Sequence, residues 1–180
     1  MLKRILFLIF LLACLAGFSQ RFKAGETYIK FYSDAPIEDI EAEHISVSSL
    51  LDIETRALVI VIPIKSFVFK KKLMQEHFNE NYLESDKYPN ATFKGKIEDW
   101  DGSHGETDAT AIGTLEIHGV IREIRIKGVI EYVDEKIKLS TVFPIKLEDY
   151  KIKIPKAVFY NIAEEVEVTA KLEYLPYEKN

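Results

Sequence analysis

The chain contains one cysteine, Cys14, among its 180 residues. This cysteine lies in an apolar N-terminal segment, so the rest of the sequence cannot form a disulfide bond within itself. Small exported domains that lack a sufficient core usually depend on disulfides, and the scarcity of cysteine excludes a scaffold of that kind. A domain of this length can instead be held together by the burial of apolar side chains.

Long apolar runs are also scarce, because only Ile5–Phe18 is almost uninterrupted, and it follows a short basic head. The run is shorter than the roughly 20 residues that a membrane-spanning helix needs. Gly17 and Ser19 provide the small residues that a signal peptidase accepts at positions −3 and −1. We therefore predict a signal peptide over residues 1–19 and a mature domain over 20–180, exported to the periplasm or secreted.

A second interpretation of the N-terminus involves Cys14. The segment Leu11–Cys14 loosely resembles a lipoprotein box, in which the cysteine would be lipidated and would anchor the protein. The apolar run before Cys14 is short for this purpose, and leucine two places before the cysteine is unusual. Cleavage after Ser19 is therefore the favoured prediction.

Basic residues are in the minority, with 24 Lys and Arg against 29 Asp and Glu. Removal of the signal peptide takes away Lys3 and Arg4 and leaves 22 basic residues. Nucleic acids and anionic membrane surfaces both favour clustered Lys and Arg. The charge balance therefore argues against nucleic acid as a partner and against strong membrane binding, whereas transient membrane contact stays compatible with it.

Motifs for catalysis are absent: there is no Gly-x-Ser-x-Gly elbow, phosphate-binding glycine loop or dinucleotide fingerprint. Glu116 and His118 lie two residues apart on one predicted strand face, where both could ligate a metal. A third ligand is not visible, and catalytic zinc sites normally have three. We predict no catalytic residues, no metal and no cofactor. The chain has four histidines that could serve as metal ligands or catalytic groups: His44, His77, His104 and His118.

Most of the remaining sequence alternates apolar and polar residues with period two, which predicts strands with one buried face. The later strands have polar outer faces, so no second sheet covers them. About eight such strands close most simply into an antiparallel, lipocalin-like barrel, which removes sheet edges and can hold a small ligand. The predicted strands are 27–33, 44–51, 56–69, 93–97, 111–117, 124–132, 137–145 and 165–175.

Residues 58–62 within the third of these strands are apolar on both faces. A strand of this composition is usually covered on both sides. We therefore expect another element to pack on its outer surface.

Two predicted hairpins agree on which side of the sheet is buried. A turn at Gly119-Val120 would pair Leu115 with Ile124 and Gly113 with Ile126. A turn at Asp134-Glu135 would pair Tyr132 with Ile137, Ile130 with Leu139, and Ile126 with Phe143. A slip of one residue would invert a whole strand, so this agreement supports the meander.

Residues 70–85 form the one clear predicted helix. Met74, Phe78 and Tyr82 recur every fourth residue and form an apolar stripe. We expect the helix to pack at the end or the side of the barrel. Its stripe is explained either by core packing alone or by contact with a ligand.

Three segments carry a resemblance to a known family. Residues 74–85 (MQEHFNENYLES), 87–95 (KYPNATFKG) and 113–122 (GTLEIHGVIR) resemble the YceI-like family of lipid- and polyisoprenoid-binding proteins. The match is best over residues 66–122 and extends weakly through 147–152. The resemblance implies a lipocalin-like barrel around an apolar tunnel that binds long apolar chains, and many members are exported. The sequence lacks the tryptophan often found near the mature N-terminus, since its sole tryptophan is Trp100.

The resemblance and the inward-facing pattern together predict which residues line the tunnel. Four small inward residues, Gly95, Ala111, Gly113 and Gly128, either hollow the barrel or mark bends needed for closure. The predicted lining is Met74, Phe78, Tyr82, Phe93, Ile97, Leu115, Ile117, Ile126, Ile130, Leu139 and Phe143.

Arg122 is the candidate for contact with a polar head group. In the predicted hairpin it lies opposite Ile117 and points inward near a barrel end. A guanidinium there needs a partner. That partner is either the head group of a lipid or a carboxylate of the protein itself.

We therefore expect a non-enzymatic, exported protein that carries or sequesters an isoprenoid-like amphiphile, of polyprenyl or quinone type. Two alternatives stay open: an enzyme acting on a hydrophobic substrate, and a packed barrel serving as an interaction module. The sequence is compatible with a monomer or a homodimer.

Overall fold

The structure is a computed structural model that describes residues 21–34, 39–153 and 164–177. The predicted signal peptide, with Ser19 and Cys14, lies outside these ranges. Within them, no helix has both the length and the apolar character needed to cross a membrane.

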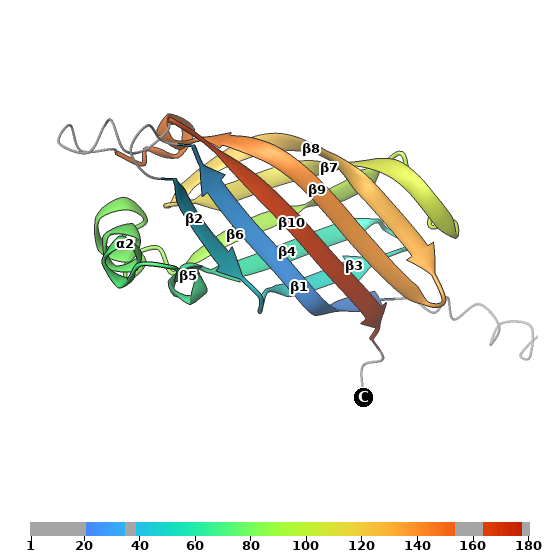
Figure 1. The fold of residues 1–180 in the computed structure, drawn as a ribbon. Helices are drawn as coiled ribbons and strands as arrows, with labels where there is room; N and C mark the ends of the chain where they lie inside the picture. Colours follow the sequence, from blue (N-terminus) through green and yellow to red (C-terminus); the bar gives the residue numbers. More distant parts are fainter. Residues whose placement is uncertain (1–20, 35–38, 154–163, 178–180) are drawn as a thin grey trace, which may run out of the picture.

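The architecture is a closed antiparallel barrel of eight strands, as predicted (Figure 1). Neighbouring strands follow the order β10-β9-β8-β7-β6-β4-β3-β1, and the pairing of β1 with β10 closes the barrel. The strands are β1 (Arg21–Ser33), β3 (Ser48–Asp52), β4 (Ala57–Pro63), β6 (Asn90–Glu98), β7 (Gly105–Ile117), β8 (Val120–Val133), β9 (Lys136–Lys146) and β10 (Glu165–Pro176).

Two short strands and four helical segments complete the described chain. They are β2 (Ile40–His44), β5 (Val68–Phe69), the 3-10 helices η1 (Ile64–Ser66) and η3 (Leu147–Tyr150), α2 (Lys72–His77) and the π-helix η2 (Phe78–Tyr82). β2 pairs with the second half of β1, and β5 pairs with β2. The predicted helix over 70–85 is therefore confirmed as an 11-residue segment over 72–82, and Figure 1 shows α2 beside one end of the barrel.

Several predicted strand limits are wrong. β1 begins at Arg21 and not at Thr27, because Phe22 is buried and pairs with both β3 and β10. The predicted strand 44–51 is two strands, since residues 45–47 leave the ladder between β2 and β3. These two strands share β1 as a neighbour, with β3 at the start of β1 and β2 at its end.

The predicted strand 56–69 is also divided. Pro63 ends β4 with a φ of −64°, and η1 then interrupts the strand before β5. The expected cover on the outer face of β4 is wrong as well: Val59 is 37% exposed. The division turns Phe67 and Phe69 toward the barrel interior, where both are buried.

The hairpin predictions were right about the buried face and partly wrong about pairing. The β7–β8 turn is His118-Gly119, both residues having positive φ, so Leu115 lies opposite Arg122 and Gly113 opposite Ile124. Each predicted partner is displaced by two residues, which preserves the face. The Asp134-Glu135 turn is confirmed, with its Tyr132–Ile137 and Ile130–Leu139 pairs, but the β8–β9 ladder ends at Val129–Ser140 and does not include Ile126–Phe143.

One end of the barrel is packed solid with side chains. Trp100 lies in the loop between β6 and β7, is 2% exposed, and donates its indole N–H to the carbonyl oxygen of Ser103. Its ring makes an edge contact with Tyr132, and His104 stacks on the same Tyr132 ring. Tyr174 is fully buried beneath them and shares a 2.7 Å hydrogen bond with Ser49. Large buried side chains therefore occupy the interior at this end.

We predict that acid destabilises the fold through His44. Its ring is buried; Nδ1 accepts the backbone N–H of Ser46, and Nε2 lies 3.1 Å from the carbonyl oxygen of Pro63, to which the neutral ring donates. Burial lowers the pKa of His44. The unfolded chain then binds the proton more readily, so the free energy of unfolding should fall as the pH drops below about 6.5 toward the lowered pKa.

Urea unfolding at pH 7.5 and pH 5.5 measures this effect. The loss of stability at the lower pH should shrink in His44→Gln and persist in His104→Gln, whose side chain is exposed at the opposite end of the barrel. An equal loss in His44→Gln and the parent would contradict the assignment.

Candidate functional site

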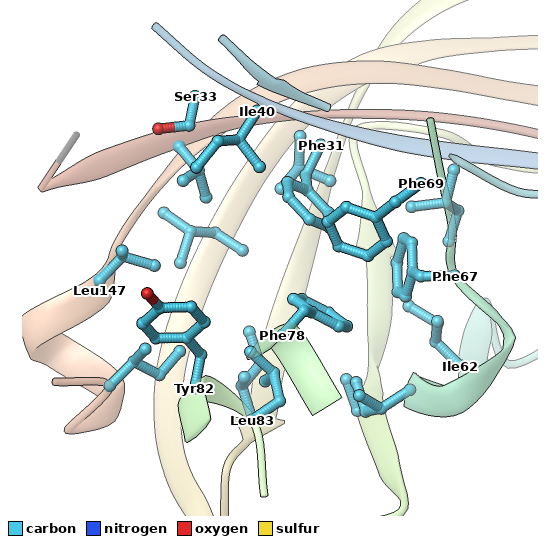
Figure 2. A pocket seen from close by; sticks show the side chains of 18 of the residues that line it. Phe31, Ser33, Ile40, Ile62, Phe67, Phe69, Phe78, Tyr82, Leu83 and Leu147 are labelled. Atoms are coloured by element: carbon cyan, nitrogen blue, oxygen red, sulfur yellow. The ribbon is translucent and has the colours of Figure 1, made fainter. Parts of the chain in front are cut away.

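The candidate site is a cavity of about 330 Å³ at the end of the barrel where α2, η2 and η3 lie. Its walls come from both ends of the chain, including β1, β7, β9 and β10, with the helical segment on one side. Figure 2 shows the labelled side chains converging on this space. The described barrel is therefore hollow at one end and packed at the other.

Six of the eleven predicted lining residues lie on this cavity: Met74, Phe78, Tyr82, Leu115, Ile117 and Phe143. The other five belong to the packed core or contact it, and do not line the cavity: Phe93, Ile97, Ile126, Ile130 and Leu139. The alternation that marked the eight strand residues among the eleven as inward-facing reports the side of the sheet and not the depth along the barrel axis.

Four phenylalanines form one wall of the cavity. Phe78 of η2 stacks on Phe31 of β1 at a centroid distance of 5.3 Å and contacts Phe67 and Phe69 at 5.7 and 5.0 Å. Aromatic pairs at such distances stabilise beyond the area they bury. This Phe cluster (Phe31, Phe67, Phe69, Phe78) therefore holds the helical segment against the barrel while leaving ring faces toward the cavity (Figure 2).

The π-helix brings a residue into the site that the sequence analysis missed. The backbone N–H of Leu83 donates to the carbonyl oxygen of Phe78, five residues earlier. This wider turn places Leu83 near the face that carries Phe78 and Tyr82, and Leu83 is buried in the cavity wall. A period of 3.6 residues excludes position i+5 from the stripe, so α-helical spacing could not find it.

His118 fixes the helical segment to the rim of the barrel. Its Nε2 lies 2.7 Å from a carboxylate oxygen of Glu84, and its Nδ1 lies 3.2 Å from the carbonyl oxygen of Tyr150 in η3. Tyr88 packs edge-on against the same ring, with centroids 4.7 Å apart. One side chain in the β7–β8 turn thus joins the two segments that frame the cavity.

Arg122 lies outside the cavity. Its guanidinium pairs with the carboxylate of Asp149, and both residues line a separate, polar groove of about 440 Å³ beside β8 and β9. Arg122 faces Leu115 and not Ile117, as the corrected register requires. Of the two roles considered, the pairing with a carboxylate of the protein is the one present in the structure.

The small inward residues do not hollow the cavity. Gly95, Ala111, Gly113 and Gly128 are absent from its described lining. A Cβ atom on Gly113 would lie 2.2 Å from the carbonyl oxygen of Lys94 and 2.5 Å from the Cα of Gly95. The glycines allow the close approach of paired strands.

The cavity is almost entirely apolar in character. Among the described lining residues none is Asp, Glu, Lys or Arg, and the polar side chains are Ser33, His77 and Tyr82. The described part of the chain also brings together no group of three His, Cys, Asp or Glu residues that could hold a metal. This arrangement is suited to enclosing apolar matter, because the lining offers few groups able to polarise a substrate.

Comparisons with known proteins give the same picture. The family model of the YceI-like domain matches residues 21–174. No curated protein matches the sequence. Among solved structures, a polyisoprenoid-binding domain from Saccharophagus degradans, implicated in plant cell wall breakdown, superposes with a TM-score of 0.75 at 16% identity, over 87% of this chain and 98% of that one.

Two further structures are similar in fold. Burkholderia cenocepacia BcnA superposes with a TM-score of 0.68 at 17% identity, over 82% of this chain and 95% of its own. The YceI protein of Campylobacter jejuni gives a TM-score of 0.59 at 22% identity, over 74% and 81% of the two chains.

Proposed function

Since the chain belongs to the YceI-like domain family, we propose that it binds an isoprenoid-like amphiphile, of polyprenyl or quinone type, in the cavity beneath α2 and η2. The observation that carries this proposal is the cavity itself, about 330 Å³ and lined almost entirely by apolar side chains. Ligand sites in proteins usually have volumes of about 300–1,000 Å³, so this one suits a short chain or one end of a longer one.

The binding energy comes from burial of hydrocarbon. Each buried CH₂ contributes roughly 0.8 kcal/mol relative to water, so a five-carbon isoprene unit contributes about 4 kcal/mol at most. A membrane offers the same chain a similar apolar environment, so a net gain requires shape and polar contacts. We propose a carrier or scavenger of a scarce lipid, without catalysis. The N-terminal sequence supports export to the periplasm or beyond the cell, by way of a signal peptide over 1–19.

We predict that protein purified from its native host contains an extractable lipid. Extraction with organic solvent followed by mass spectrometry should return one isoprenoid class in near-stoichiometric amount. Delipidated protein should then bind an isoprenoid alcohol saturably at one site, measured by titration.

The Val168→Trp variant, in which the cavity is filled, is the control for this experiment. It should yield little lipid under the same extraction. An empty extract from the parent protein, together with no saturable binding of isoprenoids, would refute the proposed function.

A further inference from the structure

The polar atoms of the cavity are unevenly placed. Figure 2 shows the hydroxyl oxygens of Tyr82 and Ser33 on the side of Leu147, and the Phe cluster on the other side. His77 is exposed and lies at the solvent edge of the lining. The cavity thus has an aromatic side and a side with hydroxyl groups, which gives a bound amphiphile a preferred direction.

Tyr82 offers a hydrogen bond that the described chain does not use. Its phenol is partly buried and points into the cavity, and no residue within the described ranges is its hydrogen-bond partner (Figure 2). Burial raises the pKa of Tyr82, so the hydroxyl stays protonated at neutral pH and can both donate and accept. The hydroxyl lies on the open cavity and is not among the fully buried unpaired atoms of the described chain, so a ligand oxygen that hydrogen-bonds to it would take the place of water there.

The described lining contains no Lys or Arg to pair with an anionic ligand group, and its one imidazole, His77, is exposed at the solvent edge. An anion transferred from water into an apolar site requires a cationic partner. Arg122, on the neighbouring strand β8, is paired with Asp149 of η3 in the outer groove. The lining of that groove contains three acidic residues, Glu123, Asp149 and Glu165, and two basic residues, Arg122 and Lys146. It therefore does not favour an anion.

Given the proposed function, we infer that the cavity selects an uncharged amphiphile, with its hydroxyl or carbonyl oxygen hydrogen-bonded to Tyr82 and its chain directed toward the Phe cluster. Prenyl phosphates and fatty acid anions are thereby disfavoured relative to the corresponding alcohols or quinones. Tyr82 is the residue that distinguishes an amphiphile from a plain hydrocarbon.

Three ligands with the same fifteen-carbon skeleton test this inference: farnesol, farnesyl phosphate and the saturated hydrocarbon farnesane. Each is titrated into delipidated protein in competition with a neutral polyene probe. We expect farnesol to bind at least about tenfold more tightly than farnesyl phosphate, because an unpaired buried anion costs more than the 1.4 kcal/mol that a factor of ten represents.

The variant Tyr82→Phe completes a double-mutant cycle. It keeps the ring and removes the hydroxyl, so farnesol should lose about 3–10-fold in affinity while farnesane is unchanged, as the net value of one hydrogen bond predicts. Tyr177→Phe is the matched control, since Tyr177 is 44% exposed after β10 and should alter neither affinity.

The outcomes separate the two proposals. Farnesyl phosphate binding as tightly as farnesol, or Tyr82→Phe weakening farnesol and farnesane equally, overturns the inference and leaves lipid binding intact. Failure of all three ligands to bind overturns the proposed function together with this inference.

Discussion

Gly113→Ala is expected to destabilise the barrel by about 3 kcal/mol or more, although it adds a single methyl group. The new Cβ would meet the carbonyl oxygen of Lys94 at 2.2 Å and the Cα of Gly95 at 2.5 Å. These are backbone atoms of the paired strand β6, which cannot rotate aside as a side chain can. Relief would require β6 and β7 to separate at the Gly95–Gly113 pair.

Gly25→Ala is the matched control for this variant. A Cβ at Gly25 would lie 3.5 Å from a side-chain carbon of Leu175, which is ordinary van der Waals contact. Urea unfolding followed by circular dichroism should therefore show Gly25→Ala close to the parent and Gly113→Ala strongly shifted to lower urea. A midpoint for Gly113→Ala that matches the parent would contradict the close approach.

These glycines illustrate how far the sequence could predict the interior. Period-two alternation placed Gly95 and Gly113 on the buried face correctly, because inside and outside follow directly from the pleat. It could not decide between a hollowed tunnel and a close approach of strands. That decision depends on how closely β6 and β7 approach each other, which is a property of the paired strands in the barrel and not of either strand alone.

The two hairpins show a similar limit on what could be predicted from the sequence. Asp134-Glu135 was identified by its polar pair between apolar strands, and its predicted pairs Tyr132–Ile137 and Ile130–Leu139 are confirmed. The turn before β8 was placed one residue late, because glycine was assigned to the first turn position. His118 occupies that position with a φ of 53°, a conformation that few side chains adopt and that its contacts with Glu84 and Tyr150 support.

Part of the candidate site could be predicted from periodic patterns in the sequence and part could not, for a physical reason. Met74, Phe78 and Tyr82 followed from helical spacing, and Leu115 from strand alternation. Phe67 and Phe69 were assigned to a continuous strand, and only the break after Pro63 turns them inward. The site therefore depends on an interruption of regular structure, which periodic patterns do not report.

The depth of the cavity was the least predictable feature. Ile130 and Phe143 both face inward from neighbouring strands, yet Ile130 is fully buried in the packed end and Phe143 lines the cavity. The difference arises from Trp100, Tyr132 and Tyr174, whose large rings fill one end. Their convergence is set by barrel closure, which joins β10 to β1.

Val168→Trp is expected to weaken ligand binding by at least tenfold while leaving the fold intact. Val168 lies on β10 opposite Phe143 and lines the cavity, so an indole there would occupy space otherwise available to a ligand. Displacing one five-carbon unit removes about 4 kcal/mol of burial, which corresponds to a loss of up to roughly a thousandfold. Equilibrium titration with farnesol or a neutral polyene measures the loss.

Val142→Trp is the matched control, because it makes the same substitution one strand away on the outer surface. It should leave the affinity for the ligand unchanged. Val142 of β9 lies opposite Thr169 and is 58% exposed, so its indole would project into solvent. Both variants should keep the folded structure in urea unfolding, but Val168→Trp is expected to unfold at a somewhat lower urea concentration than Val142→Trp, because its indole N–H is a donor placed against an apolar lining. If Val168→Trp retains parental affinity while folded, the ligand does not occupy this cavity, and the outer groove beside Arg122 becomes the site to examine.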